Sequence, residues 1–264
     1  MSCATASEIK SVLDQLDECP AWSIYINKIA EIVHKLGGQL SLFGGALRRC
    51  FEYTSHPSSS DLDVWICGIE YSPFIKILET LNLDLVYHPI AKKVHFGGYA
   101  KIGGVKYGNM HIVSSTLYGQ PIDFVWHAEN YGPGTLDFVA NGLELVYTPS
   151  LPWDWNLKEV WMGEERGYTV RDSINECRTK ITTMIPLDNN VSPAARRHRA
   201  NRYKKMESMG YLEKGDPRAW YEEYSNKEHS LSYYGRQNGQ ELLTYCDNNG
   251  NDDIDEFSSE EEEE

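Results

Sequence analysis

The chain has 264 residues, of which 41% are hydrophobic and 12% aromatic, so it can bury a substantial core. No stretch approaches the roughly 18 consecutive apolar residues of a membrane span, and the N-terminal MSCATASEIK lacks the basic and then apolar order of a signal peptide. We therefore expect a soluble, cytoplasmic protein without a membrane partner.

The net charge of −14 is concentrated at the C-terminus. Residues 247–264 contain four Asp and six Glu without Lys or Arg, which leaves only −4 for residues 1–246. Such a segment repels itself and buries little, so we expect disorder there. A solubilising tail and a mimic of RNA that occupies a basic groove of the same chain both remain open. Nucleic acid is not excluded, because the charge distribution matters more than its total.

The six cysteines are scattered, with no C-x-x-C pair and no His at zinc-finger spacing. The pattern therefore predicts reduced thiols rather than a disulfide framework or a zinc site.

The N-terminal part of the chain reads as helices followed by a strand. Residues 5–36 predict two helices interrupted at a proline, because apolar residues recur at intervals of three and four. Residues 39–43 alternate like a strand, Gly44-Gly45 interrupts it, and residues 46–53 return to helical spacing.

Two further strands in the middle of the chain carry aspartates. Residues 61–67, DLDVWIC, alternate with period two, which places Asp61 and Asp63 on one face. After a helix predicted near residues 74–81, residues 111–118 and 121–127 predict a hairpin that turns at Gly119-Gln120.

The C-terminal half is predicted to be mostly helical. A short helical segment is expected from Thr135, residues 149–168 are expected to connect the sheet to later helices, and Ser192 with Pro193 predicts the start of another helix.

The aspartates suggest a metal site. Two carboxylates that lie two residues apart on a strand are roughly 6.5–7 Å apart at the backbone, and their side chains can converge on two Mg²⁺ ions about 3.5–4 Å apart. Asp123 is the candidate third ligand, because pairing beside residues 61–66 would aim it at the same place. Asp137, at the start of a predicted helix, is the alternative. A solvated strand end would show the same pair of aspartates.

The glycine pair suggests a phosphate site. A glycine turn before a helix lets backbone N–H groups approach an anion closely, although Gly-Gly at a strand end is also a common turn.

Three motifs resemble the nucleotidyltransferases of the DNA polymerase β superfamily, most closely the head domain of tRNA nucleotidyltransferases and bacterial poly(A) polymerases. LFGGALRRCF is similar to their Gly-Gly-x-x-Arg motif, with Arg49 where an acidic residue is usual. SSDLDVWI matches the Asp-x-Asp motif, and LDFVANGLEL resembles Arg-Asp-Phe-Thr-x-Asn-Ala, with Leu136 and Val139 in place of Arg and Thr. RRHRANRYKKMESMGY is similar to the family's arginine-rich neck helix.

The resemblance implies an α+β fold with a polymerase β-like mixed sheet flanked by helices and a C-terminal helical segment, to which the charge pattern adds a disordered acidic tail. We therefore expect a catalytic domain with N-terminal helices (1–148), a mostly helical neck-like domain (149–246) and the tail (247–264). The Glu-Asp-x-x-Arg element that chooses the nucleotide has no counterpart after Tyr211, and the domains that measure tRNA are absent.

The resemblance also implies the site. A nucleoside triphosphate and two Mg²⁺ ions would bind, with Asp61, Asp63 and Asp123 as catalytic metal ligands. The nucleotide-binding residues would be Gly44, Gly45, Arg48, Asp137 and Asn141. The RNA-binding residues would be Arg196, Arg199, Arg202, Lys204 and Lys205.

The implied reaction transfers a nucleotide to an acceptor hydroxyl and releases pyrophosphate. An RNA or tRNA 3′ end is the leading acceptor. Transfer to a protein or a small molecule, and a catalytically inactive binding or regulatory module, are the alternatives. The sequence leaves the nucleotide and the oligomeric state open.

Overall fold

The computed structural model describes residues 4–53, 55–81, 86–87, 110–128, 132–133, 137–150, 153–160, 163–164, 166–185, 193–214, 234–237 and 240–243. The chain forms two compact units, Met1–Pro217 and Arg218–Glu264. In the second unit, β10 (Tyr234–Gln237) and β11 (Gln240–Leu243) pair as an antiparallel hairpin. The disorder predicted for residues 247–264 concerns a segment outside the described residues.

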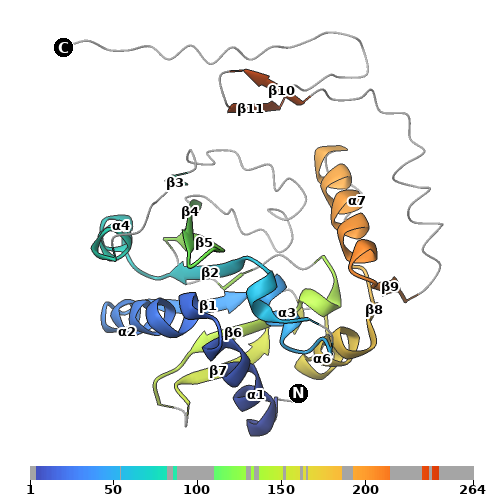
Figure 1. Ribbon diagram of the computed structural model, residues 1–264, viewed down its shortest axis with the longest axis horizontal. Coiled ribbons are helices and arrows are strands. Elements are labelled where there is room, and N and C mark those ends of the chain that lie inside the picture. The colour runs from blue at the N-terminus through green and yellow to red at the C-terminus, as the bar shows by residue number, and fades with distance from the viewer. Residues whose placement is uncertain are drawn as a thin grey trace. The chain divides into compact units, whose positions relative to one another are not determined.

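The first unit is built on one mixed sheet with the strand order β3-β4-β5-β2-β1-β6-β7 (Figure 1). β2 and β5 pair in parallel, and the other neighbours pair antiparallel. The strands are β1 (Gln39–Phe43), β2 (Leu62–Cys67), β3 (Val86–Tyr87), β4 (Met110–Leu117), β5 (Gln120–His127), β6 (Leu143–Tyr147) and β7 (Trp155–Glu159). The expected α+β class with a mixed sheet flanked by helices is confirmed.

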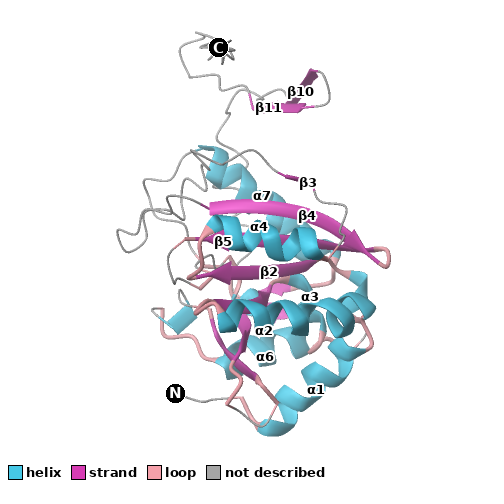
Figure 2. Ribbon diagram, turned by 90° about the vertical axis from the view of Figure 1, so that its left-hand side faces the viewer, coloured by secondary structure: helices cyan, strands magenta, loops and turns pink. Residues whose placement is uncertain are grey.

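One face of this sheet carries the hydrophobic core. Residues in register on neighbouring strands point to the same face, and one such row is apolar throughout: Val113, Phe124, Val64, Leu42, Leu145 and Leu157. All six side chains are buried. The helices α2 (Asn27–Lys35) and α4 (Tyr71–Thr80) lie on this side (Figure 2). There Phe74 stacks on Trp126 with ring centroids 6.3 Å apart.

The adjacent row points to the opposite face and is polar except for Phe43. It consists of Ser114, Asp123, Asp63, Phe43, Glu144 and Lys158. Alternation along β2 and β5 therefore separates the carboxylates from the core, since Val64 and Phe124 bury their side chains under the helices.

The remaining helices complete the first unit. α1 (Ala6–Asp17) begins with a capping box formed by Thr5 and Glu8, and the π-helical segment η1 (Trp22–Ile26) leads directly into α2. The other elements are α3 (Gly45–Arg49), the 3₁₀ turn η2 (Pro57–Ser59), α6 (Val170–Thr179), β8 (Ile181–Thr182), α7 (Pro193–Ser208) and β9 (Leu212–Glu213). None of these described helices is long and apolar enough to cross a bilayer.

Several sequence predictions are confirmed. The two N-terminal helices, the strand at 39–43 and the helix that begins with Pro193 all form. The hairpin of residues 111–127 also forms, but its two-residue turn is Tyr118-Gly119, one position earlier than expected, because Leu117 pairs with Gln120. Both turn residues have positive φ, at 50° and 81°, as a tight hairpin turn of this length requires.

Three predictions were wrong. The helix expected from Thr135 is limited to the 3₁₀ turn η4 (Val139–Asn141), and the apolar LELVY that follows is strand β6, because a short fully buried run has no period that separates helix from strand. The segment expected to connect the sheet to later helices, 149–168, contains edge strand β7, which folds back to pair antiparallel with the preceding strand β6. The helix expected over 46–53 ends at Arg49, where tight turns take over.

Candidate metal centre and its cavity

Three carboxylates meet at one end of the parallel pair β2–β5. Asp63 and Asp123 are register partners on these strands, and Asp61 immediately precedes β2. One oxygen atom from each of the three carboxylates lies within 4.8 Å of the other two. Asp123 rather than Asp137 is therefore the third member of the cluster, because strand register carries it there. Oxygen atoms from several carboxylates are the donors that Mg²⁺ prefers.

The cluster is electrostatically strained without a cation. Burial, followed by the charges of Asp61 and Asp123, raises the pKa of Asp63 to about 7, while Arg202 and Lys205 act in the opposite direction. Ser114 donates a short hydrogen bond to Asp123. Like charges held at this separation disfavour one another's ionisation, and a bound divalent cation would remove that penalty. The arrangement fits a metal centre on this ground.

The glycine pair packs directly against these carboxylates. Gly44 has φ +78°, and a Cβ added to it would lie 2.3 Å from Oδ2 of Asp63. A Cβ added to Gly45 would lie 2.5 Å from Oγ of Ser60. The first glycine is therefore required both by its backbone conformation and by the close approach of the backbone to the acidic cluster.

A cavity of about 510 Å³ opens beside the cluster. It is lined by residues from α3, the η2 turn, the start of β2, the β4–β5 hairpin and α7: Gly45, Arg48, Arg49, Ser58, Ser59, Ser60, Asp61, Asp63, Gly119, Pro121, Arg202, Lys205, Met206 and Met209. Two of its walls are joined, since Nε2 of Gln120 donates to the carbonyl oxygens of Pro57, at 3.3 Å, and Ser60, at 2.9 Å.

Three of the predicted nucleotide-binding residues form a buried hydrogen-bond network instead of converging on the carboxylates. Arg48 Nη1 donates to Asn141 Oδ1 at 2.7 Å, and Asn141 Nδ2 donates to Asp137 Oδ1 at 2.8 Å. Arg48 Nε pairs with Glu52 at 3.0 Å, and Arg202 Nε pairs with Asp137 Oδ2 at 2.6 Å. Arg48 still reaches the cavity wall, whereas Asp137 and Asn141 support that wall from behind.

Asp137 is ionised by its partners. Burial alone would raise its pKa, but the charges of Arg202 and Arg199 and the hydrogen bonds from Asn141 and Arg202 hold the pKa below the ordinary value. The network thus fixes α7 and η4 to α3 through a buried carboxylate that is fully paired.

The basic residues of α7 lie in three environments: the buried interior, the cavity wall and the exposed surface. Arg199 is only 1% exposed, and its Nη1 donates to the carbonyl oxygens of Asp137, at 2.7 Å, and Ile185, at 2.6 Å. Such a side chain does not face solvent as an RNA-contacting residue would. Arg202 and Lys205 line the cavity and Lys204 is exposed. The side chain of Arg196 lies outside the described part of the structure.

Sequence reasoning missed two methionines that line the cavity, Met206 on α7 and Met209 directly after it. Met206 and Met209 accept contacts from Arg48, with Nη1 at 3.5 Å from one sulfur and Nη2 at 3.1 Å from the other. The spacing of Arg202, Lys205, Met206 and Met209 by three and four residues was the available signal, because it marks one helical face.

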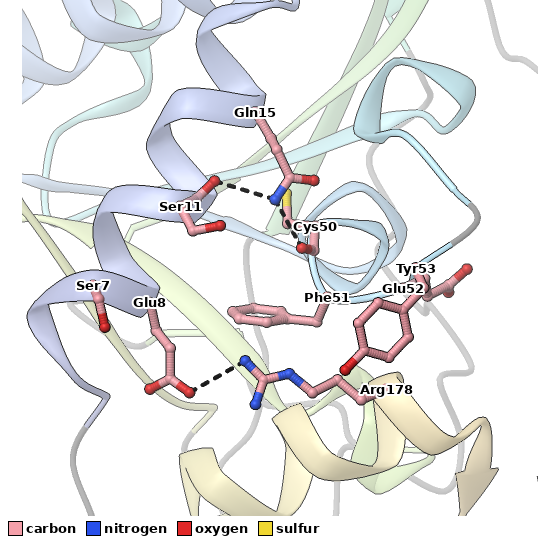
Figure 3. Close-up of a pocket in the computed structure, with 9 residues that line it drawn as sticks. All are labelled: Ser7, Glu8, Ser11, Gln15, Cys50, Phe51, Glu52, Tyr53 and Arg178. Carbon is pink, nitrogen blue, oxygen red and sulfur yellow. Dashed lines mark hydrogen bonds and ion pairs between the residues drawn. The ribbon is translucent and has the colours of Figure 1, made fainter.

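A second cavity, of about 390 Å³, lies between α1, the residues after α3 and α6 (Figure 3). There Arg178 Nη2 lies 3.4 Å from Glu8 Oε1, and Gln15 Nε2 donates to the carbonyl oxygens of Ser11 and Cys50. Its charged groups are paired with protein partners, since Glu8 also binds Arg171 and Glu52 binds Arg48. The cavity beside the carboxylates is therefore the better candidate for a charged ligand.

Neither a protein-family model nor a curated protein matches this chain.

Proposed function

We propose that the protein is a Mg²⁺-dependent nucleotidyltransferase that transfers a nucleoside monophosphate from a nucleoside triphosphate to an acceptor hydroxyl, with release of pyrophosphate. The observation that carries this proposal is the convergence of Asp61, Asp63 and Asp123 from in-register strands beside the Gly44-Gly45 backbone. Reactions at phosphorus need charge neutralisation and positioning above all, and a carboxylate cluster beside a cavity offers both.

The roles follow from position. Asp61 and Asp63 would hold two Mg²⁺ ions and Asp123 one of them, and these ions would supply charge neutralisation at the phosphates and activation of the acceptor hydroxyl. Gly44 and Gly45 bring backbone, without side chains, next to the carboxylates, so that phosphate oxygens can approach. The 510 Å³ cavity gives this chemistry a bounded space with cations on its α7 wall.

An RNA 3′ end is the acceptor that we propose first, because Arg202 and Lys205 line the cavity and Lys204 is exposed on the same helix. Transfer to a protein or a small molecule would use the same carboxylates. A binding module without activity would have no need for three mutually repelling side chains.

The test combines the purified full chain with Mg²⁺, each α-labelled nucleoside triphosphate in turn and total cellular RNA. We expect label in RNA from the wild type and background label from Asp61→Asn and Asp63→Asn. Asp14→Asn, which changes an exposed carboxylate of α1 that pairs with Lys10, should behave as the wild type. Label on the protein itself would identify a protein acceptor. Full activity in either site variant, or no label from any nucleotide, would reject the proposal.

A further inference from the structure

We propose that Arg49, Arg202 and Lys205 form a phosphate-binding subsite in the cavity beside the three carboxylates. This inference deepens the proposed function and rests on it for the source of the phosphate. All three residues line the same cavity as Asp61 and Asp63. They come from two separate elements, α3 and α7, which the buried Arg48 network holds together.

The charges of the cavity indicate an anionic ligand. Its lining contains four cationic side chains and the carboxylates Asp61 and Asp63. Arg48 is neutralised by Glu52 at 3.0 Å, and Arg202 is paired with Asp137 at 2.6 Å. Within the described ranges, neither Arg49 nor Lys205 makes an ion pair. When Mg²⁺ neutralises the carboxylates, these two cations remain without a counter-charge in the cavity.

Arg49 supplies an independent indication. Its Nε is buried and has no hydrogen-bond partner among the residues that the structure describes, and its Nη2 has only the sulfur of Met209 at 3.9 Å. A buried guanidinium N–H without an acceptor is costly. An oxygen atom of a ligand in the cavity would satisfy it.

Phosphate fits these groups better than a single carboxylate does. Guanidinium groups bind phosphate oxygens through two parallel N–H donors, and a lysine ammonium adds a third cation. The ion pair with Asp137 fixes the Arg202 side chain before a ligand arrives, which reduces the entropic cost of binding. The phosphate could belong to the incoming nucleotide or to the acceptor strand, and the two sources have the same chemistry.

The binding test uses inorganic triphosphate in the presence of Mg²⁺ and isothermal titration calorimetry on the full chain. Arg49→Gln and Lys205→Gln should each raise Kd about tenfold, the effect expected for one charge-assisted hydrogen bond. Lys35→Gln removes the same charge from an exposed residue of α2 and should leave Kd unchanged. Lys205 is exposed, so its variant should fold even if Arg49→Gln does not. A Kd for both variants equal to that of Lys35→Gln would overturn the proposal.

The transfer assay then separates the sources. A raised KM for the nucleotide alone assigns the subsite to the triphosphate, and a raised KM for RNA alone assigns it to the acceptor. An active wild type whose variants change neither KM would refute the subsite and keep the proposed function. An inactive wild type that binds triphosphate, with weaker binding in Arg49→Gln, would refute the proposed function and keep the subsite.

Discussion

Asp63 lies half-buried between two further carboxylates, and its pKa is raised to about 7 by burial and by Asp61 and Asp123. Its register partners, Asp123 on β5 and Phe43 on β1, fix its backbone on both sides within the sheet. Such a residue costs stability when no cation is bound, which is common at functional sites.

The first prediction concerns the pH dependence of this cost. Between the ordinary pKa of 3.8 and about 7, the folded protein keeps a proton on Asp63 that the unfolded chain loses, so the free energy of unfolding falls as the pH rises through this window. Without metal, Asp63→Asn should therefore be more stable than the wild type at pH 8, by on the order of 2 kcal/mol, and show no such gain at pH 4. Urea denaturation in EDTA measures both values. A variant that is less stable at pH 8 would contradict this account.

The second prediction concerns Gly44. An alanine there meets both an unfavourable φ of +78° and a clash with Asp63 at 2.3 Å, so Gly44→Ala should cost about 3 kcal/mol or more. Gly37 provides the control, since its φ of +83° is similar but nothing lies within 4 Å of an added Cβ. Gly37→Ala should cost only about 1–2 kcal/mol. Equal losses in thermal or urea denaturation would show that the close approach to Asp63 does not matter.

At the scale of elements, the basic residues of α7 lie in two environments, a cavity wall and the buried interior, which the sequence does not distinguish. One face presents Arg202 and Lys205 to the cavity, while Arg199 turns inward and donates to carbonyl oxygens of two other segments. The basic side chains of the helix are therefore divided between the cavity wall and the buried interior.

The third prediction tests this division. Arg199→Ala should lower the free energy of unfolding by about 3 kcal/mol, because it leaves two carbonyl oxygens without their charged donor. Glu207→Ala, an exposed change on the same helix, should stay within about 0.5 kcal/mol of the wild type. If Arg199→Ala instead weakened RNA binding and left the free energy of unfolding unchanged, Arg199 would be an RNA-contacting residue and this prediction would be wrong.

For the whole molecule, the division at Pro217 places the sheet, α7 and the candidate site in one compact unit. The Tyr211 hydroxyl lies 2.9 Å from Glu52, in the turns after α3, and Lys180, directly after α6, donates to the Met209 carbonyl at 2.9 Å. The residues up to the end of α7 therefore belong to the same compact unit as the sheet, on both sides of the domain boundary expected after residue 148.

The fourth prediction follows from this organisation. A chain of residues 1–217 should melt within about 3 °C of the full protein. A chain of residues 1–192 should melt far lower, because Asp137 loses Arg202 and Arg199 and keeps a buried charge. Differential scanning calorimetry of both fragments provides the measurement. A large loss in the longer fragment would show that residues 218–264 are needed for stability.

Local periodicity was sufficient to predict which strand residues are polar and where several elements begin or end. The alternation in DLDVWIC and PIDFVWH assigned Asp61, Asp63 and Asp123 to polar sheet faces, and the positions of Gly44 and Pro193 located the ends of elements. These features follow from spacing along the chain, since the side-chain period of a strand is fixed by its geometry.

Features that depend on partners far apart in the chain could not be predicted from local spacing. The parallel register of β2 with β5 selected Asp123 over Asp137, and sheet pairing made LELVY a strand. Arg199, which was expected to contact RNA, is buried and bonds to backbone carbonyl oxygens of the fold. Arg49, which none of the motifs indicated as a site residue, lines the cavity. The physical reason is that burial, charge pairing and register arise between segments far apart in the chain, where local spacing contains no information about which partner a side chain will meet.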